Sequence, residues 1–436
     1  MTSRRAALSQ FIVVNSKLLK QAPFRLLALV IFVGFCVWTI SSSVRLGLSQ
    51  IFVKYSLGTG NIMVAEKAIE MSPKNADTHR ARAAVLALSQ PAESAIELER
   101  AVALRPSDYS QWVELGLVRD QIGDQSAALA AFDEAVKHAP FYAVPRWQRG
   151  NLLLRMGRYD SAFADLNQAA QSNPEFLPNL IDLAWELSHG DAHLVEQLVQ
   201  VNSKTAHTAM AKFFANHGKP QEALAQLQAA GAVDDEFRRQ LIDNLLSKGS
   251  FPEAFQVWRA AHGLGSAASP AGPQILDGGF EGTLTFDEGS FSWRIPSHMQ
   301  ATTVSLDSSE PHTGNKSLRI EFAGDSSRGE GWLSQLLLVE PLQRYKINFA
   351  VRSQDIVTGG LPIVIVTDAS GDHKTLGQSR PLSRGTTAWN VVSFDFTAPP
   401  TTKAVVLSIQ RQGCSTSPCP IFGAISLDSF SIEQLK

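Results

Sequence analysis

The chain of 436 residues is 44% hydrophobic and 18% charged, so it can bury several cores and its length indicates two or three domains. The first 25 residues contain five basic side chains and no acidic one, so the net charge of −2 leaves about −7 on the rest of the chain. A mildly acidic body lacks the electrostatic footprint of a nucleic-acid-binding protein.

Residues 26–44 carry no charge and are mostly apolar, and as a helix they would extend roughly 28 Å. We therefore expect a single transmembrane helix at residues 26–46. Its basic flank, residues 1–25, predicts a cytoplasmic tail, with everything beyond residue 50 on the far side. A cleaved signal peptide is the alternative, because Ser41–Ser43 supply small residues near the end of the apolar run.

One pattern of small and apolar residues occurs twice between Tyr109 and Pro174, at a spacing of 34 residues. A fixed period of this length in helix-forming sequence predicts stacked pairs of antiparallel helices. The small residues let two helices approach, and each proline ends the second helix of a pair. The recurring positions are Gly116 and Gly150, Gly123 and Gly157, Ala128 and Ala162, Phe132 and Leu166, Ala135 and Ala169, and Pro140 and Pro174.

The first copy resembles the tetratricopeptide repeat family through Trp112, Leu115, Gly116, Gly123, Ala128, Phe132, Ala135 and Pro140. Weaker copies on both sides extend the pattern, so we expect a solenoid of six or so helix pairs over residues 57–262. The repeated residues build a scaffold and perform no chemistry. The resemblance implies a surface that binds a protein partner.

The second copy departs from the family pattern, because Arg146 and Arg149 occupy positions that the family normally fills with apolar residues. Two arrangements are open. Either the helix is rotated so that Trp147 lies in the core, or Trp147, Asn151 and Arg155 face the groove and contact the partner.

Residues 263–274 are small and polar, contain two prolines, and predict a linker. The sequence then changes to short alternating runs divided by Gly, Pro, Ser and Thr, which predict an antiparallel β-sandwich over residues 275–436. The runs are Phe291–Ile295, Leu318–Phe322, Tyr345–Val351, Val392–Phe396, Val405–Ile409 and Leu427–Ile432.

Motifs across this domain resemble the galactose-binding-like jelly rolls that include carbohydrate-binding modules of the family 4, 9 and 22 type. They are Leu276–Glu281, Phe291-x-Trp293, His312–Ile320 and Leu427–Phe430. The resemblance implies a jelly roll that contacts glycan. It also implies a structural calcium ion at Glu281 and Asp428, two hard oxygen ligands that would tie the first strand to the last. The alternative is that both are ordinary turn carboxylates.

Sugar recognition needs flat aromatic faces and polar side chains for hydroxyl groups. The candidates are Trp332, Tyr345 and Trp389, with Gln335 and Arg352 as polar neighbours. Trp332 is favoured because it follows the charged stretch 325–331, where a loop could present it.

Cys414 and Cys419 close a short loop before the final strand. In an extracytoplasmic compartment we expect a disulfide there in preference to free thiols or a metal pair.

The sequence thus predicts a multidomain protein with an N-terminal transmembrane helix, an all-α tetratricopeptide-type solenoid and a C-terminal antiparallel β-sandwich, the jelly roll. It contains no phosphate-binding glycine loop, nucleophile elbow or zinc-binding helix motif, and no paired carboxylates that stand out for glycoside hydrolysis. We therefore expect no enzyme.

The architecture looks like factors of envelope or exopolysaccharide assembly systems. We expect a non-catalytic scaffold in a bacterial inner membrane, with its bulk in the periplasm, an envelope protein on its repeats and a polysaccharide on its sandwich. The first alternative is a purely structural interaction protein whose sandwich binds no sugar. The second is an unrecognised glycan-processing enzyme.

Overall fold

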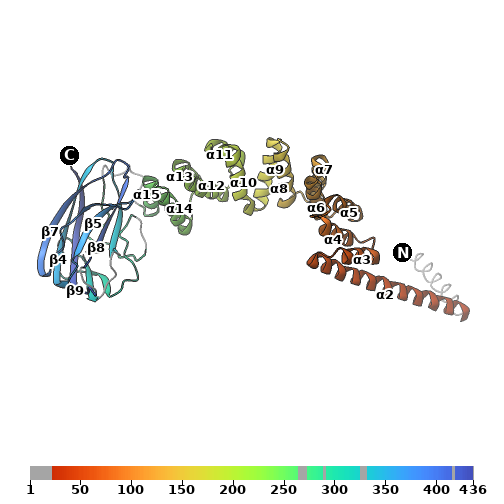
Figure 1. Cartoon of the computed structure of the whole chain (residues 1–436), viewed down its shortest axis with the longest axis horizontal. Coiled ribbons are helices and arrows are strands. Elements are labelled where there is room, and N and C mark those ends of the chain that lie inside the picture. The colour runs from red at the N-terminus through yellow and green to blue at the C-terminus, as the bar shows by residue number, and fades with distance from the viewer. Residues whose placement is uncertain (1–21, 264–272, 288–290, 325–330, 415–417, 436) are drawn as a thin grey trace, which may run out of the picture. The chain divides into compact units, whose positions relative to one another are not determined.

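The computed structural model describes residues 22–263, 273–287, 291–324, 331–414 and 418–435, with side chains from residue 26 onward. The chain divides into two compact units, Met1–Val201 and Asn202–Lys436. Helices fill the described part of the first unit, whereas the second contains helices followed by strands (Figure 1). This order confirms a multidomain chain with a helical repeat region before an antiparallel sheet domain. Most of the expected N-terminal tail and linker lie outside the described residues.

The described helices of the first unit form consecutive antiparallel pairs, with a short 3-10 turn, η1 (Pro174–Phe176), between the fourth pair and the fifth. Asparagine or aspartate caps several of them, as where Asp108 accepts the amide of Ser110 at 3.1 Å. The pairs are α2 (Ala22–Thr59) with α3 (Ile62–Met71), α4 (Ala76–Leu86) with α5 (Pro91–Leu104), α6 (Tyr109–Gln121) with α7 (Gln125–His138), α8 (Ala143–Arg155) with α9 (Tyr159–Ser172), and α10 (Leu177–Leu187) with α11 (Ala192–Val199).

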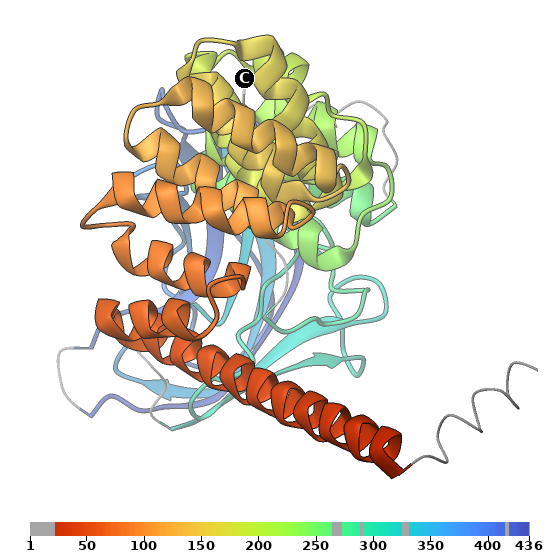
Figure 2. The same cartoon turned by 90° about the vertical axis from the view of Figure 1, so that its right-hand side faces the viewer.

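Helix α2 runs through the boundary that the sequence suggested near residue 57. Among the described residues, its segment Leu26–Thr59 is the one helix long and apolar enough to cross a membrane, and an 18-residue window within it has a mean hydropathy of 2.2. Near its C-terminal end, however, Val53 is buried with Ala68 of α3 and Ala81 of α4. Figures 1 and 2 show this unbroken helix beside α3. The first repeat pair therefore uses the end of α2 as its first helix, because no proline interrupts that segment.

The second unit begins where the repeat pattern is weakest. Helix α11 has only 8 residues, and it ends at Gln200 in the left-handed region with φ 48°. Two more helix pairs follow, α12 (Lys204–Asn216) with α13 (Pro220–Ala230) and α14 (Asp235–Ser247) with α15 (Phe251–Ala261).

The rest of the second unit consists of two antiparallel sheets whose inner faces share one apolar core. Strand order is β1-β2-β9-β4-β7 in one sheet and β3-β8-β5-β6 in the other. The strands are β1 (Thr302–Asp307), β2 (Ser317–Gly324), β3 (Leu333–Leu338), β4 (Arg344–Thr358), β5 (Pro362–Asp368), β6 (Thr375–Gln378), β7 (Gly385–Thr397), β8 (Ala404–Arg411) and β9 (Ile421–Leu435).

One expected strand does not form. In the run Phe291–Ile295, Arg294 and Ile295 make isolated bridges, to Ser334 and Phe286 respectively. The run turns its aromatic residues inward instead. Trp293 joins the core of the sheets, and the ring of Phe291 lies 5.0 Å from that of Phe255 in α15. The final helix therefore shares an aromatic contact with the segment that precedes the sheets.

Candidate functional site

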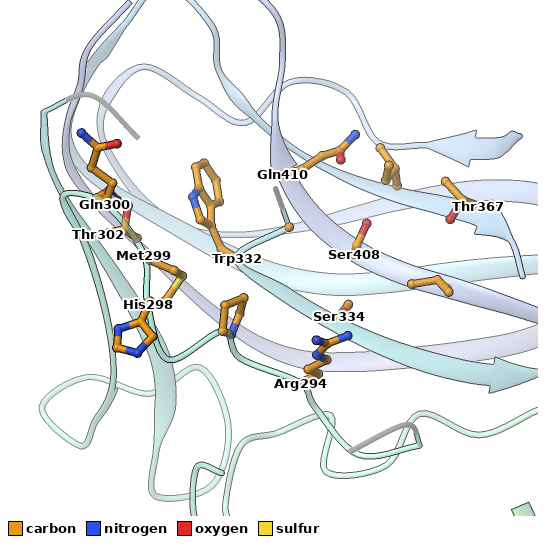
Figure 3. A pocket seen from close by; sticks show the side chains of 14 residues that line it. Arg294, His298, Met299, Gln300, Thr302, Trp332, Ser334, Thr367, Ser408 and Gln410 are labelled. Carbon is orange, nitrogen blue, oxygen red and sulfur yellow. Dashed lines mark hydrogen bonds between the residues drawn. The ribbon is translucent and has the colours of Figure 1, made fainter. Parts of the chain in front are cut away.

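A hollow of about 490 Å³ lies on the outer face of the four-stranded sheet. Ser334, Ile365 and Ser408 are neighbours across β3, β5 and β8 and line its floor. They alternate with core residues such as Leu333 and Leu407, so the period of two along each strand turns them outward. The loop before β1 completes the lining with Arg294, Pro296, His298, Met299 and Gln300 (Figure 3).

Trp332, the favoured sugar-binding residue, lines this hollow but is only 3% exposed. Its amide donates to Ile409 at 2.9 Å, and its ring lies 4.6 Å from Phe322 in the core. The side chain therefore shapes the wall of the hollow and offers no open face on which a sugar ring could stack. The stretch 325–330 that precedes it lies outside the described residues.

The four other sugar-binding candidates are not gathered at the hollow. The buried Gln335 amide accepts the N–H of Leu276 at 3.0 Å and donates to its carbonyl at 2.9 Å. Tyr345 is fully buried, its hydroxyl accepts the amide of Glu340 at 2.8 Å, and burial raises its pKa. Arg352 and Trp389 belong to β4 and β7 of the five-stranded sheet, where the guanidinium lies 5.4 Å from the indole centroid.

The three partner-binding candidates of the helical region share one face of α8, because they are spaced four residues apart. Trp147 is half-buried and stacks on Phe176 with ring centroids 4.6 Å apart. The Asn151 amide donates to the carbonyl of Trp147 at 2.9 Å. Arg155 forms an ion pair with Asp120 of α6 and remains 51% exposed. The structure thus brings all three together on a partly exposed surface, without placing Trp147 in a deep core.

Residues 146–176 match the tetratricopeptide repeat family. No curated protein matches the chain. The chain therefore carries a tetratricopeptide-type helical repeat at α8 and α9, in a segment that makes up a small part of its length.

Several solved structures are similar to parts of the chain. A crystal structure of MamA is 15% identical and covers 48% of this chain and 95% of its own, with a TM-score of 0.29. PilF of Pseudomonas aeruginosa is 17% identical, with a TM-score of 0.33, and the match covers 50% of this chain and 99% of PilF. A structure described as "CBM4 structure and function" is 12% identical, with a TM-score of 0.28, and the match covers 37% of this chain and 99% of that structure's chain. Likenesses at this level carry no functional conclusion.

An ionic cluster explains why the second tetratricopeptide copy departs from the family pattern. Arg149 donates from Nε to Oδ2 of Asp165 at 2.6 Å and from Nη2 to Oδ1 at 2.7 Å, and Arg146 donates to the same Oδ1 at 3.2 Å. The hydrogen bond to Asp165, which is itself buried, raises the pKa of Arg149. Arg146 also donates to the Pro140 carbonyl, as Trp112 does to Pro106 one repeat earlier.

Glu281 and Asp428, the candidate calcium ligands, both hold the loop between β1 and β2. Oδ2 of the buried Asp428 accepts the amides of His312 and Thr313, each at 2.9 Å. Oε1 of Glu281 accepts the amides of Asn315 at 2.7 Å and Lys316 at 3.1 Å. These N–H donors, those of Asn315 first, lower the pKa of Glu281.

A calcium ion does not fit this arrangement. The Lys316 ammonium donates to the carbonyl of Glu281 at 3.0 Å and to that of Gly282 at 3.3 Å, so a cation already occupies the carbonyls beside the carboxylate. Ca²⁺ needs six to eight oxygen ligands free of such donors. The described residues also contain no group of three or more His, Cys, Asp or Glu side chains that could hold a metal. The two carboxylates instead hold the loop between β1 and β2 by accepting hydrogen bonds from its backbone amides.

Cys414 and Cys419 form a disulfide that closes the loop before β9.

Sequence reasoning missed the residues that surround the hollow, Arg294, His298, Gln300, Thr367, Ser408 and Gln410. Part of the signal was available, because Ser408 alternates with Leu407 and Ile409 in the predicted strand Val405–Ile409, and Gln410 directly follows it. The loop residues Arg294, His298 and Gln300 carry no sequence pattern that predicts a site, because only the fold brings them over the sheet.

Proposed function

We propose that this protein is a non-catalytic, membrane-anchored extracytoplasmic scaffold. Its helical repeats bind a protein partner, and its sheet domain, a jelly roll like those of carbohydrate-binding modules, binds glycan. The hollow on the four-stranded sheet carries the glycan part of the proposal. It combines apolar surface from Pro296 and Met299 with hydroxyl and amide groups from Ser334, Ser408 and Gln410, the mixture that sugar recognition needs.

The anchor is α2. Most of its apolar side chains between Leu26 and Tyr55 are exposed, and a bilayer would cover them. The basic residues before it favour a cytoplasmic N-terminus in a bacterial inner membrane, and the disulfide suits an oxidising periplasm. The competing function of this segment is a signal sequence. N-terminal sequencing of the protein from its host decides, because cleavage near Ser43 would rule out the anchor.

The repeat partner is expected on the α8 face that carries Trp147, Asn151 and Arg155. Crosslinking in the native membrane, followed by identification of the captured proteins, tests this assignment. A variant with Trp147→Ala and Arg155→Ala should lose the crosslink while α8 stays folded. Recovery of the same partner at full yield would remove this face from consideration. Partners from envelope or exopolysaccharide assembly would support a role there.

Glycan binding is tested by filling the hollow. Thr367 lies on the outer face of β5, so Thr367→Trp adds bulk to the hollow without entering the core. We expect this variant to lose retention on immobilised polysaccharides, whereas Thr397→Trp, at an exposed position on β7, should retain it. If the unchanged protein binds no polysaccharide, the sheet domain has no glycan function.

One observation favours the alternative, a purely structural scaffold. Gln335 and Tyr345 are buried and make hydrogen bonds inside the domain, and Trp332 is only 3% exposed. Under this alternative, the sheet domain would contact protein and ignore sugar. Co-purification of a protein with the full chain but not with a chain ending before residue 275, together with an empty glycan array, would establish it.

A further inference from the structure

The basic side chains at the rim of the hollow set the class of glycan that fits it. Arg294 and His298 are both exposed and line the hollow from its loop side (Figure 3). None of the described residues that line it is acidic. Arg294 also forms no ion pair within 4.0 Å among the described residues, so its guanidinium is available to a ligand, unlike that of Arg352, which pairs with Glu310.

One carboxylate lies nearby without lining the hollow. Asp287 accepts the amide of Ser297 at 3.0 Å, and hydrogen bonds from Ser297, followed by the charges of His298 and Arg294, hold its pKa below the usual range. The low pKa keeps Asp287 ionised, so its charge attracts His298 and Arg294, although it forms no ion pair with Arg294 within 4.0 Å. The hollow itself keeps the guanidinium of Arg294 at its rim, over a floor that includes hydroxyl and amide groups.

We infer that the hollow binds an anionic glycan, a polysaccharide whose sugar units carry carboxylates. This inference rests on the proposed glycan function and narrows it. The planar guanidinium of Arg294 can donate two parallel hydrogen bonds to one carboxylate, and a neutral sugar has no such charged acceptor. Ser334, Thr367, Ser408 and Gln410 donate to and accept from the remaining hydroxyl groups.

The arrangement separates two tasks. The sheet residues recognise features that every hexose polymer shares, whereas Arg294 recognises the acidic group. Removal of the guanidinium should therefore reduce the preference for acid over neutral polymer without abolishing contact with sugar. Because the side chain is exposed, its replacement should leave the fold intact.

The test compares polygalacturonate with the same polymer after chemical reduction of its carboxyl groups, each titrated into the full-length protein in detergent. We expect the acidic polymer to bind at least tenfold more tightly, the range expected for a hydrogen bond to a charged group, and this preference to weaken with salt. Arg294→Gln should remove most of the preference, and Arg294→Lys should keep part of it. The matched control is Arg344→Gln, an exposed arginine of β4 in the other sheet that pairs with Asp395.

The outcomes separate the two levels of the proposal. Equal binding of both polymers, with no effect of Arg294→Gln, overturns the anionic class and leaves glycan binding in place. A preference that Arg344→Gln removes and Arg294→Gln does not would assign the acid site to the five-stranded sheet. Binding of neither polymer by a folded protein would overturn this inference. If wider polysaccharide panels also fail, the proposed glycan function fails with it.

Discussion

The α-carbon of Gly116 in α6 faces the ring of Phe132 in α7 so closely that a β-carbon at Gly116 would lie 2.5 Å from Cε1 of that ring. The equivalent pair one repeat later, Gly150 and Leu166, leaves 2.7 Å to Cγ of the leucine. Glycine is thus required at this position of both repeats by the helix crossing, and its backbone freedom plays no part.

Gly116→Ala should destabilise the first unit by about 1–3 kcal/mol, because the methyl group forces α6 and α7 apart. Thermal unfolding followed by circular dichroism checks the loss. Gly58→Ala is the control, since no atom lies within 4 Å of a β-carbon there and alanine favours a helix. A variant at Gly116 as stable as the natural protein would refute the packing.

Asp165→Asn should destabilise the protein by about 2–4 kcal/mol, since it leaves two arginines without their buried counter-charge. Chemical denaturation measures the change. Asp160→Asn, on the exposed first turn of the same helix, should change stability by well under about 1 kcal/mol. If Arg149→Met in the Asp165→Asn background restores no stability, the cluster is not the cause.

Glu281 should make the stability of the sheet domain depend on acidic pH. Its folded-state pKa is lowered, so its contribution is complete above the unfolded value of about 4.5 and is lost as the pH falls through the folded value. Glu281→Gln should therefore lower the melting temperature at neutral pH, and this difference should shrink as the pH falls below about 4.5. The comparison is a melting curve at each pH. A difference in melting temperature between the two proteins that grows as the pH falls would contradict a lowered pKa of Glu281 in the folded state.

Chelation should leave the melting temperature unchanged, because Glu281 and Asp428 bind amide groups in place of a metal. Scanning calorimetry with EDTA, and then with excess Ca²⁺, provides the measurement. A fall with EDTA that Ca²⁺ reverses would restore the calcium ion that the resemblance implies.

The sequence predicted the repeats well because their period depends on residues that pack within a single helix pair. Gly116, Phe132 and Pro140 carry that information locally. It also predicted most long strands, but missed β5, in which Ile363 to Val366 form an unbroken apolar run without alternation. The sugar-binding candidates failed to gather for a physical reason. Aromatic type alone does not distinguish a core residue such as Tyr345 from a surface residue, and the hollow depends on loops brought together by the fold.

The unbroken course of α2 has a mechanical consequence. It spans 38 residues, roughly 57 Å, about twice the thickness of a bilayer core, and contains no proline after Pro23. A continuous helix of this length transmits rotation and bending along its axis. If lipid holds its apolar part, a force on the first repeats therefore rotates or tilts the helix in the bilayer, because no flexible linker separates the two. A flexible glycine-rich insert after Leu46 would uncouple the two.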